Sequence, residues 1–197
     1  MEKLRESFYR RDDVIAISRE LLGKVLSTRI DGLLTRVVIT ETEAYAGVTD
    51  KASHAYGGRR TKRTEPMFSG GGVAYVYLCY GIHHLFNVVT SIEGTPHAVL
   101  VRAGHPLEGV EIMLERRGKE ALDAGLLGGP GSLAKALGIT TGLSGLSLQS
   151  EVVWIEDRGI SIAPGIVRAS SRIGVDYAGE DAQLPYRFRA DLATLEL

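Results

Sequence analysis

Residues 41–54 bring two carboxylates, a phenol, an aspartate and an imidazole together within one short stretch of the chain. The stretch follows an apolar run at residues 37–39, and this combination predicts a strand. Side chains alternate between the two faces of a strand, so we expect Glu41, Glu43 and Tyr45 to share one face. Carboxylates and an aromatic ring on one face, followed by a histidine, suit a site that binds a flat polar substrate and moves a proton.

Three tyrosines mark a second group at residues 73–81. Tyr75 and Tyr77 have the same parity on the predicted strand, so their rings form either a stacking wall or part of an aromatic core. Tyr80 lies three residues further along, which turns it to the opposite face or out onto the turn at Gly81. A tyrosine aimed separately on a hairpin tip could wedge between stacked bases.

A third group is a run of cations at residues 57–64, where Arg59, Arg60, Lys62 and Arg63 fall within five positions. Clustered cations suit contacts with nucleic-acid phosphates, and they also suit an ordinary solvated loop. Because the formal net charge of the whole chain is −1, binding to a nucleic acid would have to depend on local clusters of this kind.

Composition narrows the class of protein further. The chain has one cysteine, Cys79, which excludes an internal disulfide framework and a cysteine-based zinc site. Its first residues are charged and lack an apolar signal core, and no apolar run approaches the length of a membrane span. We therefore expect a cytoplasmic protein that works without a metal and without a membrane.

The elements that must position these groups are strands arranged in hairpins, with short helices between them. The Asp31-Gly32 dipeptide predicts a tight hairpin, and residues 46–72 read as a long functional loop. This order is typical of an α+β fold with a largely antiparallel sheet, and 197 residues fit one domain spanning 1–197. Strands are expected at residues 24–30, 33–45, 73–80, 86–92, 97–103, 152–155, 160–163 and 186–189, and helices at 14–22, 109–117 and 132–137.

Taken in order, these motifs resemble the alkyladenine DNA glycosylases, also called the 3-methyladenine DNA glycosylase family, of the type shared by mammals and many bacteria. The resemblance runs from about residue 16 to residue 188, nearly the whole chain. The matching segments are Glu41-Thr42-Glu43-Ala44-Tyr45, residues 50–54, Gly58-Arg59, Met67-Phe68, Tyr75-Val76-Tyr77, Tyr80-Gly81, Asn87-Val88-Val89, residues 99–103, residues 106–109, Gly129-Pro130 and Arg172-Ile173-Gly174.

The resemblance implies a compact fold with a curved antiparallel sheet or open barrel, from which a hairpin projects into the DNA minor groove. It also implies an enzyme of base excision repair that acts on double-stranded DNA as a monomer and without a cofactor. Such an enzyme flips out damaged purines, among them 3-methyladenine, 7-methylguanine, hypoxanthine and ethenoadenine, and hydrolyses the N-glycosidic bond. Since the match places no lysine at the reaction centre, we expect hydrolysis alone, which leaves an abasic site.

The same resemblance implies a role for individual residues. Glu43 would activate the water, with Arg102 beside it, and Tyr80 would fill the vacated stack. Asn87, expected at the head of a strand, would form the pocket floor and disfavour guanine through its exocyclic amine. The remaining base-pocket residues would be Tyr45, His54, Tyr77 and Ala44, and the DNA-backbone contacts would be Arg59, Arg60, Lys62, Arg63 and Arg172.

Some positions depart from the family pattern. His105 stands where an acidic residue usually precedes the next proline, and Ser132 replaces a common lysine. His83 and His84 lie near the proposed wedge, where an aromatic residue is often found, and we expect them to be surface histidines on a loop.

Two alternatives from other classes stay open at this stage. A carbohydrate-active hydrolase could use Glu41 and Glu43 as an acid–base pair, because neighbours two apart on one strand face have suitable spacing. A non-catalytic protein that binds damaged DNA or structured RNA could use the tyrosines and arginines alone.

Overall fold

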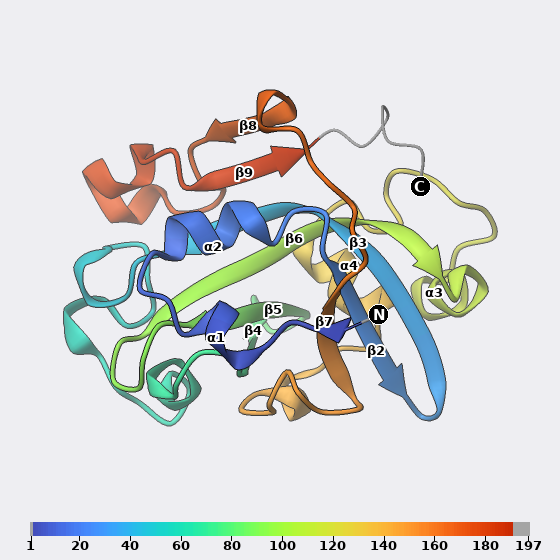
Figure 1. The fold of residues 1–197 in the computed structure, drawn as a ribbon, viewed down its shortest axis with the longest axis horizontal. Helices are drawn as coiled ribbons and strands as arrows, with labels where there is room; N and C mark the ends of the chain where they lie inside the picture. The colour runs from blue at the N-terminus through green and yellow to red at the C-terminus, as the bar shows by residue number, and fades with distance from the viewer. Residues whose placement is uncertain (1, 191–197) are drawn as a thin grey trace.

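Nine antiparallel strands pair into one curled sheet in the computed structural model, which describes residues 2–190 (Figure 1). The main path of the sheet runs β1-β7-β2-β3-β6-β5-β4, and β9 pairs with β3 on one side and with β8 on the other. The strands are β1 Glu2–Lys3, β2 Val25–Ile30, β3 Leu33–Tyr45, β4 Ala74–Cys79, β5 His83–Thr90, β6 His97–Glu108, β7 Val153–Asp157, β8 Val167–Ser170 and β9 Arg187–Ala190.

Four short α-helices pack around this sheet: α1 Glu6–Tyr9, α2 Val14–Glu20, α3 Val110–Arg117 and α4 Pro130–Ala136 (Figure 1). The Asp13 side chain accepts a hydrogen bond from the backbone N–H of Ala16 and so caps the start of α2. Gly109 precedes α3 with φ of 75°, and a Cβ there would lie 2.4 Å from the carbonyl oxygen of Leu34. The junction between β6 and α3 therefore requires glycine.

The α+β class and the curved antiparallel sheet expected from the sequence are confirmed. The Asp31-Gly32 turn joins β2 to β3 with φ of 54° and 78°, the left-handed pair that this dipeptide favours. No helix among residues 2–190 has both the length and the apolar character needed to cross a membrane.

Several expected boundaries are wrong. Residues 160–163 form no strand. Ile162 packs against the core beside Gly23, so apolar and polar residues alternate there because of side-chain burial, without hydrogen bonds to a neighbouring strand. Instead, β8 begins at Val167. The strand expected at 86–92 starts at His83, which places Asn87 in mid-strand.

The long loop at 46–72 folds back over β4 and β5. It contains three short 3₁₀ turns, at Gly47–Thr49, Tyr56–Gly58 and Glu65–Phe68. Met67 and Phe68 from this loop are buried in a small apolar cluster with Tyr75 of β4. This packing fixes the position of the loop relative to the sheet, and hence the position of the polar residues that the loop carries.

Candidate active site

Glu43 lies at the centre of the site, on the part of β3 that β6 and β9 flank. Its side chain is fully buried and meets three donors. The Tyr45 hydroxyl donates to Oε2 at 2.8 Å, the backbone N–H of Ile173 donates to Oε1 at 2.9 Å, and Arg102 Nη1 lies 3.3 Å from the same Oε1. A buried carboxylate with these partners is held in one orientation.

Tyr45 serves Glu43 as a hydrogen-bond donor. Burial, reinforced by the negative charge of Glu43, raises the pKa of Tyr45 well above its usual value. The phenol therefore stays protonated at neutral pH. The contact between Tyr45 and Glu43 confirms that the two side chains share one strand face, as the alternation predicted.

Glu41 completes that face, but its carboxylate is occupied by two guanidinium groups. Arg102 Nε donates to Oε1 of Glu41 at 2.9 Å, and Arg187 Nε donates to the same atom at 2.8 Å. Arg102 therefore bridges the two glutamates, since its Nη1 also contacts Glu43. The arrangement makes Glu41 an acceptor that fixes two arginines.

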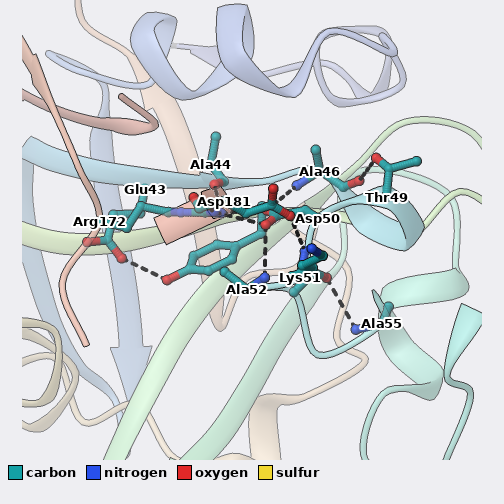
Figure 2. A network of polar contacts seen from close by, with 12 residues as sticks. Glu43, Ala44, Ala46, Thr49, Asp50, Lys51, Ala52, Ala55, Arg172 and Asp181 are labelled. Carbon is teal, nitrogen blue, oxygen red and sulfur yellow. Dashed lines mark hydrogen bonds and ion pairs between the residues drawn. The ribbon is translucent and has the colours of Figure 1, made fainter. Parts of the chain in front are cut away.

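Behind Tyr45 lies a buried ion pair between Asp50 and Arg172, shown in Figure 2. The Arg172 guanidinium donates to both oxygens of Asp50 and to the carbonyl oxygens of Ala44 and Asp181. It also stacks against the Tyr45 ring, with Cζ 4.8 Å from the ring centroid. The ion pair thus fixes the position of Arg172 in the chain. The next residue, Ile173, donates its backbone N–H to Glu43.

Two sequence expectations are corrected by this network. Arg172 was expected on the DNA backbone, but its side chain has no exposed surface and is fully paired with Asp50, so it does not face a phosphate. Ala44 was expected to line the base pocket, but its side chain lies in the main apolar core on the opposite face of β3. Only its carbonyl oxygen takes part in the site, as an acceptor for Arg172.

A pocket of about 640 Å³ opens in front of Tyr45. Its walls are largely aromatic: the Tyr75 and Tyr77 rings lie 5.6 Å apart between centroids, and His54 meets Tyr77 edge-on at 4.6 Å. Tyr177, which the sequence reasoning did not single out, lines the same pocket. Aromatic side chains packed together in this way form a wall against which a flat, aromatic ligand can stack.

His54 is neutral in this pocket. Its Nε2 faces Nη2 of Arg63 at 3.2 Å, and its Nδ1 lies 2.9 Å from the Tyr75 hydroxyl. Burial first, and then the positive charges of Arg63 and Arg59, lower the pKa of His54 from 6.5 to about 4. At neutral pH the imidazole therefore adds no charge to the pocket.

Asn87 lines the pocket and is almost fully buried. Its Nδ2 donates to the backbone carbonyl oxygens of Tyr75 at 3.1 Å and Leu85 at 3.3 Å. These bonds hold the side chain rigidly between β4 and β5. Arg102 lines the same pocket, so the pocket reaches the residues that contact Glu43.

The tip of the β4–β5 hairpin stands beside the pocket mouth. Tyr80 is 90% exposed and Ile82 is 71% exposed, which is unusual for large apolar side chains. Tyr80 has φ of 50° and Gly81 has φ of 74°, so a bulky side chain occupies a left-handed turn position. The placement of Tyr80 on the turn is confirmed, while Ile82 was missed because isolated apolar residues in turns are common.

The basic loop is less uniform than its sequence suggested. Arg60 pairs with Glu65, and Arg63 turns inward to lie over the Tyr77 ring at 5.0 Å. Arg59 and Lys62 are exposed and form no ion pair among residues 2–190. Hence Arg59, Lys62 and Arg63 have no carboxylate partner among residues 2–190, and Arg63 contacts the Tyr77 ring and His54 instead.

The family departures also have definite places. His83 and His84 lie on β5 and not on a loop, because β4 and β5 pair right up to the hairpin tip. His84 Nδ1 accepts a hydrogen bond from the backbone N–H of Thr141. Ser132 lies in α4 and lines the pocket.

No cluster of three or more histidine, cysteine, aspartate or glutamate side chains suited to a metal ion occurs within the described part of the chain. The side chains that the site brings together are the Glu43 carboxylate, the arginines that contact it and Glu41, a neutral imidazole and several phenols. Asp50 and the backbone N–H of Ile173 were not assigned roles in the sequence analysis, because their contacts join segments more than 120 residues apart.

Comparison with known proteins gives a consistent result. The sequence matches the family model for methylpurine-DNA glycosylase over residues 7–193. It is 48% identical over 186 residues to a protein of Chlamydia felis, covering 94% of each chain, and 45% identical over 195 residues to one of Desulfitobacterium hafniense, covering 95% of each. A protein of Bacillus cereus is 48% identical over 191 residues, covering 92% of each chain. All three relatives are named as 3-methyladenine DNA glycosylases.

Proposed function

The chain belongs to the methylpurine-DNA glycosylase family, and on that basis we propose that it removes damaged purines from duplex DNA with a water activated by Glu43. The observation that carries this proposal is the buried Glu43 carboxylate, which contacts Arg102 and Tyr45 at the back of an aromatic pocket. A DNA glycosylase of base excision repair needs both parts: a pocket for an extruded base and a base catalyst beside C1′.

In the proposed reaction the damaged nucleotide leaves the duplex and its base enters between the aromatic walls. A water molecule near Arg102 attacks C1′ while Glu43 accepts its proton. The N-glycosidic bond breaks, and its electron pair leaves with the purine. The attached 3-methyladenine ring is cationic, so it departs as a neutral base without further protonation.

The pocket supports discrimination among purines in two ways. The Tyr45 and Tyr77 rings would stack with cationic purines such as 3-methyladenine and 7-methylguanine against the opposing positive charge of Arg63, to which the neutral His54 adds none. Asn87 is held rigidly by two backbone carbonyls, so the exocyclic amine of normal guanine would collide with a side chain that does not move away. Hypoxanthine and ethenoadenine, which are neutral, are proposed as weaker substrates.

Extrusion of the base would be aided from outside the pocket. Tyr80 would replace the lost stacking, an interaction that contributes about 1–3 kcal/mol per base. Arg59 and Lys62 would contact phosphates, and a monomer acting in the cytoplasm on nucleoid DNA is part of the same proposal. Arg60 would add a contact only after it exchanges Glu65 for a phosphate.

The sugar-hydrolase alternative is disfavoured by one specific contact set. A retaining or inverting glycosidase needs one protonated carboxylic acid. Glu41 accepts hydrogen bonds from both Arg102 and Arg187, so its carboxylate holds two arginines in place and is not free to act on a substrate as the second member of an acid–base pair.

The decisive experiment compares wild type with Glu43→Gln on methylated duplex DNA and on a duplex with one hypoxanthine. We expect wild type to release free purine and leave alkali-labile abasic sites, and Glu43→Gln to be about 10²–10⁴-fold slower while binding the duplex normally. Borohydride should trap no covalent complex. A wild type that binds duplex DNA but releases no purine from either substrate would favour the non-catalytic binding protein.

A further inference from the structure

A second pocket, of about 570 Å³, adjoins the base pocket. The two share a wall made of Arg102, Gly129 and Ile173. Since Arg102 and Ile173 also hold the carboxylate of Glu43, the second pocket lies on the far side of the residues that fix the proposed catalytic base. Any group bound there is close to the reaction centre.

The lining of the second pocket is strongly cationic. Arg102, Arg187 and Arg189 line it with a single carboxylate, Glu41, and His105 lies at its rim. The carboxylate is already shared by Arg102 and Arg187. Arg189 is exposed and has no ion-pair partner within residues 2–190. A local positive charge of this kind is notable on a chain whose formal net charge is −1.

The register of the outer strands adds a second cation. Arg168 of β8 lies directly opposite Arg189 in the β8–β9 ladder, and both side chains are exposed. Like charges directly opposite each other on one sheet face destabilise the pairing. On its other side Arg189 lies opposite Glu41, whose carboxylate is committed to the two inner arginines. An anion seated beside Arg168 and Arg189 would relieve this repulsion.

We propose that this second pocket binds a backbone phosphate of the damaged DNA strand, with Arg189 as the contact in its lining and Arg168, the cross-strand neighbour of Arg189, as a second cation beside it. The inference rests on the proposed function for its choice of ligand. A nucleotide whose base fills the first pocket carries its phosphates past the shared wall, so the adjoining cationic pocket is placed to receive one of them. Arginine suits this task because its planar group matches the oxygen geometry of phosphate.

The proposed phosphate site would also supply cations that the DNA backbone needs and that the basic loop provides only in part. Of the five cations expected on the backbone, Arg172 is buried, Arg60 is paired and Arg63 faces the base pocket. Arg168 and Arg189, on β8 and β9, would add charge for the DNA strand beside the second pocket.

The test measures how affinity depends on salt. Full-length wild type, Arg189→Gln, Arg168→Gln and the double variant are titrated by fluorescence anisotropy against a duplex holding a tetrahydrofuran abasic-site analogue, which no glycosylase can cleave. Each lost phosphate contact should lower the slope of log affinity against log salt by about 1, so the loss of affinity between about 50 and 200 mM salt becomes about threefold smaller per variant.

Arg5→Gln is the matched control, because Arg5 is an exposed arginine next to β1, and its one ion pair among residues 2–190 is a surface contact with Glu2. Its salt slope should equal that of wild type. Circular dichroism and thermal melting check folding, and the melting temperatures of the two single variants should not fall, since each removes a like-charge neighbour. If one variant fails to fold, the other carries the test from the opposite strand.

Base release by wild type in the same preparations separates this proposal from the proposed function. Release of hypoxanthine together with a double-variant slope equal to that of wild type overturns the phosphate site alone. A reduced slope in a protein whose wild type releases no purine supports the phosphate site and overturns the glycosylase reaction. A reduced slope that Arg5→Gln reproduces also overturns the phosphate site, because the effect would then reflect bulk charge.

Discussion

The buried wall behind the base pocket and the tip of the β4–β5 hairpin are built on opposite principles. In the wall, the charged side chains of Glu43, Asp50 and Arg172 are almost completely removed from water, and each has charged or hydrogen-bonding partners. At the tip, Tyr80 and Ile82 expose apolar surface on a strained turn and contact little of the protein. The wall is preorganised in the free protein, whereas the proposed function of the tip requires a partner that covers its exposed side chains.

The largest effect should come from breaking the wall. Arg172→Met leaves Asp50 buried without its counter-charge, so we expect the free energy of unfolding to fall by about 3–5 kcal/mol, measured by urea denaturation. Burial disfavours the charge of Arg172, but hydrogen bonds and attraction to Asp50 outweigh it and raise the pKa of Arg172, so the guanidinium stays charged.

Arg59→Met is the control for this variant, because Arg59 is an exposed arginine and its loss should change stability by no more than about 0.5 kcal/mol. Adding Asp50→Asn to Arg172→Met should recover part of the loss, since the uncompensated charge is then removed. If Arg172→Met and Arg59→Met lowered the free energy of unfolding equally, the ion pair between Arg172 and Asp50 would not be what stabilises the wall.

A smaller effect, on the pH dependence of stability, should come from His54 in the base pocket. The folded pKa of His54, about 4, lies below its unfolded value of 6.5, so the unfolded chain binds more protons between these values. Stability should therefore fall as pH drops from 6.5 to about 4, by about 3 kcal/mol from this group. Denaturation of His54→Gln across that range should show a shallower slope.

His97 provides the background for that measurement, because burial lowers its pKa as well. Its contribution is present in wild type and in His54→Gln alike, so the difference between the two proteins isolates His54. Parallel stability curves for the two proteins would mean that His54 accepts a proton in the folded state without a penalty.

The sequence predicted local features of both regions well. The alternation along β3 placed Glu41, Glu43 and Tyr45 on one face, because strand geometry alone decides it. The Asp31-Gly32 turn was predicted because the dipeptide favours a left-handed pair. The position of Tyr80 on a turn followed from its spacing from Tyr77 and from the glycine after it.

What could not be predicted depends on contacts between distant segments. Arg172 looked like a surface cation, and only its pairing with Asp50, 122 positions away, shows that it is buried. The partner of Arg63 is the Tyr77 ring, on a different element. Alternation at residues 160–163 predicted a strand because side-chain burial and ladder formation leave the same pattern in a sequence. Charge and periodicity report local tendency, whereas burial is decided by the assembled fold.

At the tip, the proposed partner can be tested through Tyr80. Tyr80→Asn removes the ring but suits the left-handed turn, so we expect the hairpin to persist and duplex affinity to fall. A lost stacking interaction of about 1–3 kcal/mol corresponds to about 5- to 150-fold weaker binding of the abasic-analogue duplex. Leu33→Asn, which changes another exposed apolar residue at a hairpin end, is the control and should leave affinity unchanged.

The smallest expected effect concerns Tyr80 alone, because there the cost of backbone strain can be measured separately from the proposed binding role of the side chain. Tyr80 and Asp31 occupy the same kind of left-handed turn position, with φ of 50° and 54°. Aspartate and asparagine tolerate this conformation, whereas a bulky aromatic residue does not. Tyr80→Asn should therefore raise the free energy of unfolding of the DNA-free protein by about 0.5–1 kcal/mol, while Asp31→Asn should leave it nearly unchanged. If Tyr80→Asn gave a more stable protein that binds DNA less well, the tyrosine ring would be needed for DNA binding although its backbone conformation is strained. If Tyr80→Asn instead destabilised the free protein, the exposed ring would be stabilising the hairpin. The hairpin tip would then contribute to the stability of the free protein, as the buried wall does.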